Sequence, residues 1–122
     1  MTKEKLNVES VTAKAFYLTD EDGKVRCELS STKSRGETVI MFRMTDNDGD
    51  PLVSIEASSS RSVVSVSSPS DENAVRLMSD TNGNAVVVCN SKGWPRINIG
   101  KDKITFFDDS ANPIRTLNSK GE

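Results

Sequence analysis

Aspartate-rich turns are the segments of this chain whose residue types and spacing suggest chemistry most directly. Asp46, Asp48 and Asp50 alternate around Gly49, and an Asp-x-Asp-x-Asp-Gly run opens the calcium-binding loop of an EF-hand. Such a loop has a carboxylate at its first position and glycine at its sixth, but Met44 stands where that carboxylate is required. We therefore expect the aspartates to form turns, with a calcium site at Asp46, Asp48 and Asp50 as the weaker alternative.

Catalytic chemistry is limited because the chain has no histidine. This removes Ser-His-Asp and Cys-His nucleophiles and His-ligated metal sites, together with the commonest general base. Asp108 and Asp109 form a pair of carboxylates, but adjacent side chains point apart in a strand, and here they open a turn. We predict a non-enzymatic protein with no cofactor. An enzyme that uses Asp, Lys or Tyr17 is the third hypothesis.

The cysteines, Cys27 and Cys89, are too few for a thiolate zinc site or a disulfide scaffold. Each lies within an apolar, strand-like run, where a buried free thiol behaves as a small hydrophobic side chain. Free thiols are therefore expected. A Cys27–Cys89 disulfide is the alternative, because the repeat described below places both on the same strand face.

Net charge and hydropathy limit the partners. The chain carries 16 Lys and Arg against 18 Asp and Glu, a net charge of −2, so non-specific binding to nucleic acid is not expected. No apolar segment approaches the roughly 20 residues of a membrane helix, and residues 1–6 form no apolar signal core. These features predict a cytoplasmic protein with no signal peptide and no membrane or nucleic-acid partner. A chain derived from a phage would instead belong to a virion or surface appendage.

The aspartate turns repeat along the chain. Copies of the form Asp-x-[Asp/Asn]-Gly, the last two degenerate, occupy residues 20–23, 46–49, 80–83, 90–93 and 108–111. Asp or Asn at the first position accepts hydrogen bonds from the turn's own amides, and glycine at the fourth takes a left-handed conformation. Each copy is therefore predicted to join two strands of a hairpin. Ala111 replaces the glycine in the last copy, where we expect Asn112 to take the left-handed role.

The residues after each turn share one polarity pattern. Counted from the fourth turn position, the residues two, four and six places on are apolar in every copy except at Arg115, with proline included: Val25, Cys27, Leu29; Pro51, Val53, Ile55; Ala85, Val87, Cys89; Pro95, Ile97, Ile99; Pro113, Arg115, Leu117. Side chains alternate across a strand. The even positions of all copies are therefore predicted to face one core, among them Val53, Val87 and Ile97.

These hairpins predict an all-β fold. Strands are expected over residues 11–18, 24–30, 38–44, 51–57, 62–67, 74–78, 85–89, 95–99, 103–107 and 113–117. They form an antiparallel meander of about ten short strands, built from repeated hairpins and closing as a barrel, prism or sandwich. A β-solenoid is the alternative. We expect one domain over residues 11–117, between an N-terminal lead-in (1–10) and a C-terminal tail (118–122).

The segment from Phe16 to Leu29 reads F-x-L-x-D-E-D-G-K-V-R-x-E-L. This pattern resembles the F-x-L-x-D-x-D-G-K-x-R-x-x-L unit that small bacterial and phage-borne proteins of uncharacterised function carry in tandem. The first copy matches closely, the second and third moderately, and the last two in outline, over most of residues 11–117. The resemblance implies a β-hairpin repeat and an association with phages or mobile elements. It carries no activity and no site residue with it.

The candidate residues for contact with a ligand or partner are Trp94, Arg96, Arg26 and Tyr17. Trp94 follows a turn glycine where the other copies have Lys, Asp or Asn, and tryptophan is enriched in binding hot spots. In the alternative interpretation its ring covers Pro95 or a neighbouring hairpin. The arginines suit an anionic partner unless they pair with nearby Glu and Asp, which is the alternative for them.

Several runs are apolar on both faces, most clearly Ala85-Val-Val-Val-Cys89. A half-exposed sheet alternates, so these strands need cover on both sides, and burying each such side chain contributes about 1.5–3 kcal/mol. A closed barrel or sandwich supplies that cover, and so does a homo-oligomer, either dimer or trimer, which we expect because a domain of this size with six aromatic residues builds a modest core. We therefore predict a non-enzymatic binding or structural module that self-associates, with a protein or carbohydrate as a further partner. A β-barrel that binds a small molecule or carbohydrate is the second hypothesis.

Overall fold

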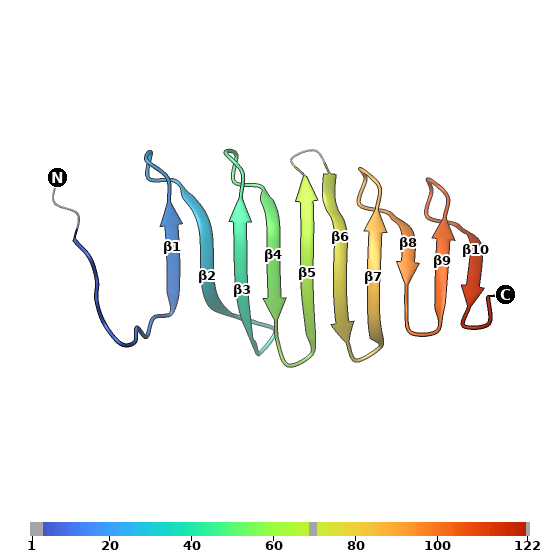
Figure 1. Ribbon diagram of the computed structural model, residues 1–122, viewed down its shortest axis with the longest axis horizontal. Helices are drawn as coiled ribbons and strands as arrows, with labels where there is room; N and C mark the ends of the chain where they lie inside the picture. The colour runs from blue at the N-terminus through green and yellow to red at the C-terminus, as the bar shows by residue number, and fades with distance from the viewer. Residues whose placement is uncertain (1–3, 69–70, 122) are drawn as a thin grey trace.

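The computed structural model describes residues 4–68 and 71–121, which form a row of strands joined by short turns (Figure 1). The strands are β1 (Ala15–Thr19), β2 (Val25–Ser34), β3 (Glu37–Thr45), β4 (Pro51–Ala57), β5 (Arg61–Ser68), β6 (Asp71–Asp80), β7 (Gly83–Cys89), β8 (Pro95–Ile99), β9 (Lys103–Phe107) and β10 (Pro113–Asn118). They hydrogen-bond in sequence order into one ten-stranded antiparallel sheet. The predicted all-β meander is confirmed.

The sheet is open and one layer deep (Figure 1). Each described strand contacts only its neighbours in sequence, and β1 and β10 lie at opposite edges. The tight hairpins bring only consecutive strands together, so nothing returns the last strand to the first. This corrects the expectation that a single chain closes as a barrel, prism or sandwich. The consecutive antiparallel pairing is also unlike the coils of a β-solenoid.

The limits of some strands differ from those predicted. β1 begins at Ala15 instead of residue 11, and β2 extends to Ser34 instead of residue 30. Arg35 and Gly36 follow β2 with positive φ angles of 51° and 82°, which suits the two-residue turn of a hairpin. The polar residues at the end of β2 therefore continue the strand beyond its predicted end at residue 30.

One face of the sheet is apolar from edge to edge. Cross-strand pairing aligns side chains of the same face into rows. The row nearer the aspartate turns contains Leu18, Cys27, Met44, Val53, Val66, Val75, Val88, Ile97, Phe106 and Arg115. The next row contains Phe16, Leu29, Phe42, Ile55, Val64, Leu77, Val86, Ile99, Ile104 and Leu117. We call the surface that these two rows define the apolar face.

The opposite face, which we call the polar face, has a central row of mixed character. That row contains Tyr17, Glu28, Arg43, Ser54, Ser65, Arg76, Val87, Asn98, Thr105 and Thr116. The described residues that are classed as buried, Val87 (5% exposed), Ser65 and Thr105, all lie in it. Long side chains such as Arg76 cover their short neighbours along the row. The best-covered part of the chain is therefore this row, not a space between two layers.

A β-bulge follows the turns at residues 20–23, 46–49, 90–93 and 108–111. The residues skipped in the cross-strand register are Arg26, Leu52, Arg96 and Ile114. An extra residue reverses the alternation of the strand beyond it. In these copies the residues four and six places after the turn therefore reach the apolar face, as Val53 and Ile55 do.

The turn at residues 80–83 has no bulge. Asp80 pairs directly with Gly83, so the link is a tight turn without an extra residue. The alternation beyond it therefore runs the other way, with Val87 on the polar face and Val88 on the apolar face. The prediction that all copies place their even positions on one face is wrong for this copy.

The cysteines lie on opposite faces, and both are free. Cys27 lies in the apolar face between Leu18 and Met44. Arg76, on the polar face, donates a hydrogen bond to Cys89 Sγ over 3.9 Å. The alternative of a Cys27–Cys89 disulfide is wrong, because it required one shared face and the two residues belong to β2 and β7.

The last aspartate turn carries a strained residue. Ala111 itself takes the left-handed conformation (φ 62°), whereas Asn112, expected to do so, does not. An L-residue in this conformation costs about 1–2 kcal/mol. Allowing for the greater freedom of glycine in the unfolded chain, we expect Ala111→Gly to raise the free energy of unfolding by about 1 kcal/mol. Urea denaturation at a fixed protein concentration measures the change.

The matched control is Gly49→Ala in the second turn. Gly49 has a φ of 89°, and an added Cβ meets no atom within 4 Å. Its effect therefore comes from the backbone conformation alone, and the free energy of unfolding should fall by about 1 kcal/mol. Ala111→Gly leaving the urea midpoint unchanged would contradict the assignment of strain to Ala111.

Candidate interaction surface

The apolar face holds most of the exposed large hydrophobic side chains of the described residues. Leu77, near the centre of the sheet, is 50% exposed, and Leu18, at its edge, is 66% exposed. The others on this side of the sheet are Phe16, Leu29, Ile40, Met44, Ile55, Val66, Val75 and Ile99. Contiguous apolar surfaces of more than a few hundred Å² mark interaction sites. The apolar face is therefore the strongest candidate for a functional surface.

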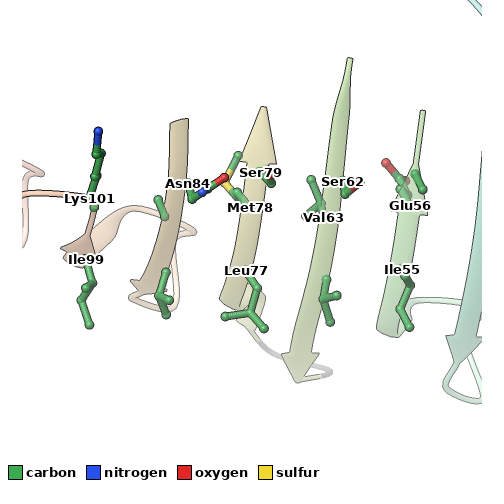
Figure 2. Close-up of a pocket in the computed structure, with 15 residues that line it drawn as sticks. Ile55, Glu56, Ser62, Val63, Leu77, Met78, Ser79, Asn84, Ile99 and Lys101 are labelled. Carbon is green, nitrogen blue, oxygen red and sulfur yellow. The ribbon is translucent and has the colours of Figure 1, made fainter. Parts of the chain in front are cut away.

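A hollow of about 790 Å³ opens over β4 to β8 on this side of the sheet. Figure 2 shows Ile55, Leu77 and Ile99 in line, each from a different strand. Across β4 to β7 the adjoining row has short side chains: Ala57, Ser62, Ser79 and Asn84. The step from long to short side chains forms the hollow, and Lys101 also lines it.

The aspartate turns are held by the first side chain of each. Asp46 Oδ1 accepts hydrogen bonds from the amides of Asp48 (2.9 Å) and Asp50 (3.0 Å). The residues that accept the corresponding pair of amides in other copies are Asp20, Asn90 and Asp108. The uncharged Asn90 accepts the same amides as the aspartates. The hydrogen bonds of the turn therefore explain why an oxygen acceptor stands at this position. Within residues 4–68 and 71–121, no three His, Cys, Asp or Glu side chains gather where they could hold a metal ion.

These hydrogen bonds lower the pKa values of two turn carboxyl groups. Hydrogen bonds from the amide and side chain of Asn112 hold the pKa of Asp108 below its ordinary value of 3.8. At Asp20, partial loss of hydration raises the pKa, but hydrogen bonds from the Lys24 amide and the Arg26 guanidinium outweigh it. The pKa of Asp20 is therefore also lowered.

The sheet is expected to lose stability in acid because of these turns. A carboxyl group whose pKa is lower in the folded chain than in the unfolded chain stabilises the fold at pH values above its unfolded pKa, about 4. This stabilisation is lost as the pH falls through the folded pKa. We expect the melting temperature to fall below about pH 4. The double variant Asp20→Asn, Asp108→Asn should show a smaller fall, because an amide oxygen preserves the turn, as at Asn90. Circular dichroism melting across this pH range tests it, and an equal fall in both proteins contradicts it.

Arg26 connects the first two hairpins. Its Nε donates to Asp20 Oδ2 over 2.6 Å, within its own turn. Its Nη1 donates to the backbone oxygen of Asp46, in the next turn along the sheet edge. The pairing with acidic neighbours, weighed above against an anionic partner, is thus present at Arg26.

Arg96 has the corresponding role between the last two hairpins. Its Nε donates to the backbone oxygen of Phe107 over 3.1 Å, and its Nη1 pairs with Asp109. Asp108, by contrast, accepts the amides of its own turn. The adjacent carboxylates of this turn therefore have separate structural partners and do not act on one common atom.

Trp94 and Tyr17 lie at different places on the sheet. Trp94 is exposed in the turn before β8, with Lys92 Nζ 5.3 Å from the centre of its ring, a cation–π contact. Tyr17 is exposed on the polar face of β1. Trp94 and Arg96 therefore lie near one end of the sheet and Tyr17 and Arg26 at the other, so the four selected contacts do not form one site.

Two arginines of the polar face have buried Nε atoms. Within the described residues, the Nε atoms of Arg43 and Arg76 have no hydrogen-bond partner. Arg43 Nη2 donates to Met41 Sδ (3.0 Å), and Arg76 reaches Cys89. Arg43 was not predicted as a site residue, because the sequence of a strand does not distinguish a buried arginine from a solvated one.

Comparison with known protein families, with curated proteins and with solved structures gives no match. In the described part of the chain, no helix has the length and hydropathy needed to cross a membrane. The resemblance to tandem hairpin-repeat proteins stays a prediction.

Proposed function

We propose that the chain is a non-enzymatic structural and interaction module that works by self-association. The observation that carries this proposal is the surface of the single chain. It exposes 9501 Å², whereas a compact chain of 13.3 kDa exposes about 6,500 Å². The difference of about 3,000 Å² exceeds what one partner contributes to a standard interface, about 800 Å². Part of it belongs to the extended residues 4–14, and much of it to the faces of a one-layer sheet.

The proposal that the chain is not an enzyme is supported by what its titratable groups do. The aspartates at the first position of the turns accept backbone amides. The half-buried arginines Arg26 and Arg96 join hairpins. These groups support the sheet, and the hollow beside Leu77 is lined mainly by apolar side chains.

Light scattering after size-exclusion chromatography tests self-association. We expect a mass of at least twice 13.3 kDa across protein concentrations from about 1 to 100 µM, because burying about 800 Å² per partner is typical of specific, stable complexes. A dimer and a trimer are distinguished by the mass itself. A mass of one chain at every concentration would overturn the proposed function.

A second candidate function is the binding of an apolar small molecule in the hollow beside Leu77. The observation that favours it is the apolar row next to short side chains. Lys101 also lines the hollow and can pair with an anionic group of the ligand. The probe is 1-anilinonaphthalene-8-sulfonate, whose fluorescence should rise with the protein. Ser79→Phe, which fills the hollow, should remove that rise, and Ser54→Phe on the polar face should not. Equal fluorescence of the two variants excludes the hollow as the site.

A further inference from the structure

The apolar face is uninterrupted across the sheet. Its two rows cross every strand, and Arg115 on the edge strand β10 is the only charged residue in them. The polar face, in contrast, carries Glu28, Arg43 and Arg76 in its central row. Charged residues are depleted in the cores of protein interfaces. The apolar face therefore has the composition of a buried surface, and the polar face has that of a solvated surface.

This side of the sheet is large enough for a stable interface. Ten strands about 4.8 Å apart give a width of about 45 Å. The two rows of the apolar face and the adjoining row on the same side, which includes Ile40 and Ala57, together span about 20 Å along the strands. The resulting area is about 900 Å², close to the roughly 800 Å² that each partner contributes to a standard interface. The partner must therefore offer an apolar surface as broad as the whole sheet.

A second copy of this chain offers such a surface. Two sheets pack face to face about 10 Å apart, with their inner side chains interdigitating. A two-fold interface uses the same patch on both chains, so both apolar faces are covered together. The apolar face holds no acidic residue that would call for a basic partner. The hollow beside Leu77 and Ser79 can accept the larger side chains of the other sheet, since protein interiors are close-packed.

We propose that two chains pack apolar face against apolar face and form a two-layer β-sandwich across the interface. This inference rests on the proposed function and names the surface that mediates self-association. The sandwich predicted for a single chain is then formed between two chains, and the polar faces remain in solvent. The open edges at β1 and β10 take no part in this contact.

The first test compares adjacent residues of β1. Leu18 lies on the apolar face and Tyr17 on the polar face, with similar exposures of 66% and 60%. Leu18→Lys should raise the dimer dissociation constant at least tenfold, and Tyr17→Lys should change it less than twofold. An edge-to-edge contact through β1 would respond to both variants alike, so equal effects overturn the proposal.

The second test uses the centre of the face. Leu77→Lys should give a mass of one chain by light scattering at concentrations where the unchanged chain is a dimer. If the unchanged chain is an oligomer and Leu77→Lys remains one, this inference fails while the proposed function stands. If the unchanged chain is a single chain, both fail. A single chain that binds anionic phospholipid vesicles would indicate a membrane surface as the occupant instead.

A labelling experiment covers the case in which Leu77→Lys does not fold. In a Cys89→Ser background, Cys27 is the remaining thiol and lies in the apolar face. We expect maleimide to label Cys27 at least tenfold more slowly at protein concentrations that favour the dimer than at concentrations that favour single chains. Labelling rates independent of protein concentration, in a protein that is an oligomer by light scattering, overturn the face-to-face contact.

Discussion

Val87→Lys is expected to abolish the folded sheet or to cost at least about 3 kcal/mol of unfolding free energy. Val87 is 5% exposed and lies in the central row of the polar face, directly opposite Arg76 on β6. A lysine there loses the contacts of the valine and places an ammonium group beside a guanidinium whose Nε is already buried without a partner. Urea denaturation at fixed protein concentration measures the loss.

Val87→Glu is the matched control for this prediction. The side chain is of similar length, but its carboxylate can accept a hydrogen bond from Arg76 Nε, which has no partner among the described residues. A hydrogen bond to a charged group contributes about 1.5–3 kcal/mol, so Val87→Glu should be more stable than Val87→Lys by about that amount. If lysine is tolerated as well as glutamate, Val87 is not enclosed beside Arg76 in the way described.

The hairpins could be predicted from the sequence because their signals are local. An Asp or Asn that accepts amides two and four residues ahead needs only its own turn, and the structure has this arrangement at Asp20, Asp46, Asn90 and Asp108. A shared first residue does not determine the whole turn, however. Asp80 accepts the amide of Asn82 and then pairs directly with Gly83.

The side of the sheet on which each residue lies depends on a feature that the turn motif does not contain. The even positions reach the apolar face only where a bulge follows the turn, as at Leu52. The absence of a bulge after residue 83 reverses the assignment of Val87. The run from Ala85 to Cys89 is apolar on both faces, so its own composition could not reveal the reversal.

The closure of the fold could not be predicted for a related reason. Apolar side chains such as Leu77 must be covered because their burial is favourable, but this requirement does not say which chain covers them. Hairpins that pair only with their neighbours leave the sheet open within one chain. The cover that a sandwich would give within one chain therefore has to come from outside the chain, and we propose that a second copy supplies it.

The candidate contact residues were selected one by one from the sequence, but their roles in the structure depend on their neighbours. Arg26 contacts the next hairpin because the bulge lies beside the turn that begins at Asp46. The broad apolar face was not selected as one surface, because its two rows become continuous only when the register of all ten strands is known. Residue type alone selects a candidate residue such as Trp94, but it does not reveal a surface.

Deleting Leu52 is expected to prevent cooperative folding, because this bulge residue sets the alternation of β4. Without it, Val53 and Ile55 would turn to the polar face and Glu56 to the apolar face, at the junction between β3 and β5. Removing two apolar side chains from their rows and placing a carboxylate there costs at least about 4 kcal/mol. Thermal melting followed by circular dichroism should show no cooperative transition.

Deleting Ile114 is the control, because it removes the bulge residue at the same position of the last hairpin. The reversal is then confined to β10, which pairs only with β9 and has one apolar residue, Leu117, in the two rows. A smaller loss of stability with a cooperative transition is expected. If deleting Leu52 is no more harmful than deleting Ile114, the chain absorbs the missing residue within its turns. The bulges would then not determine which side chains form the apolar face.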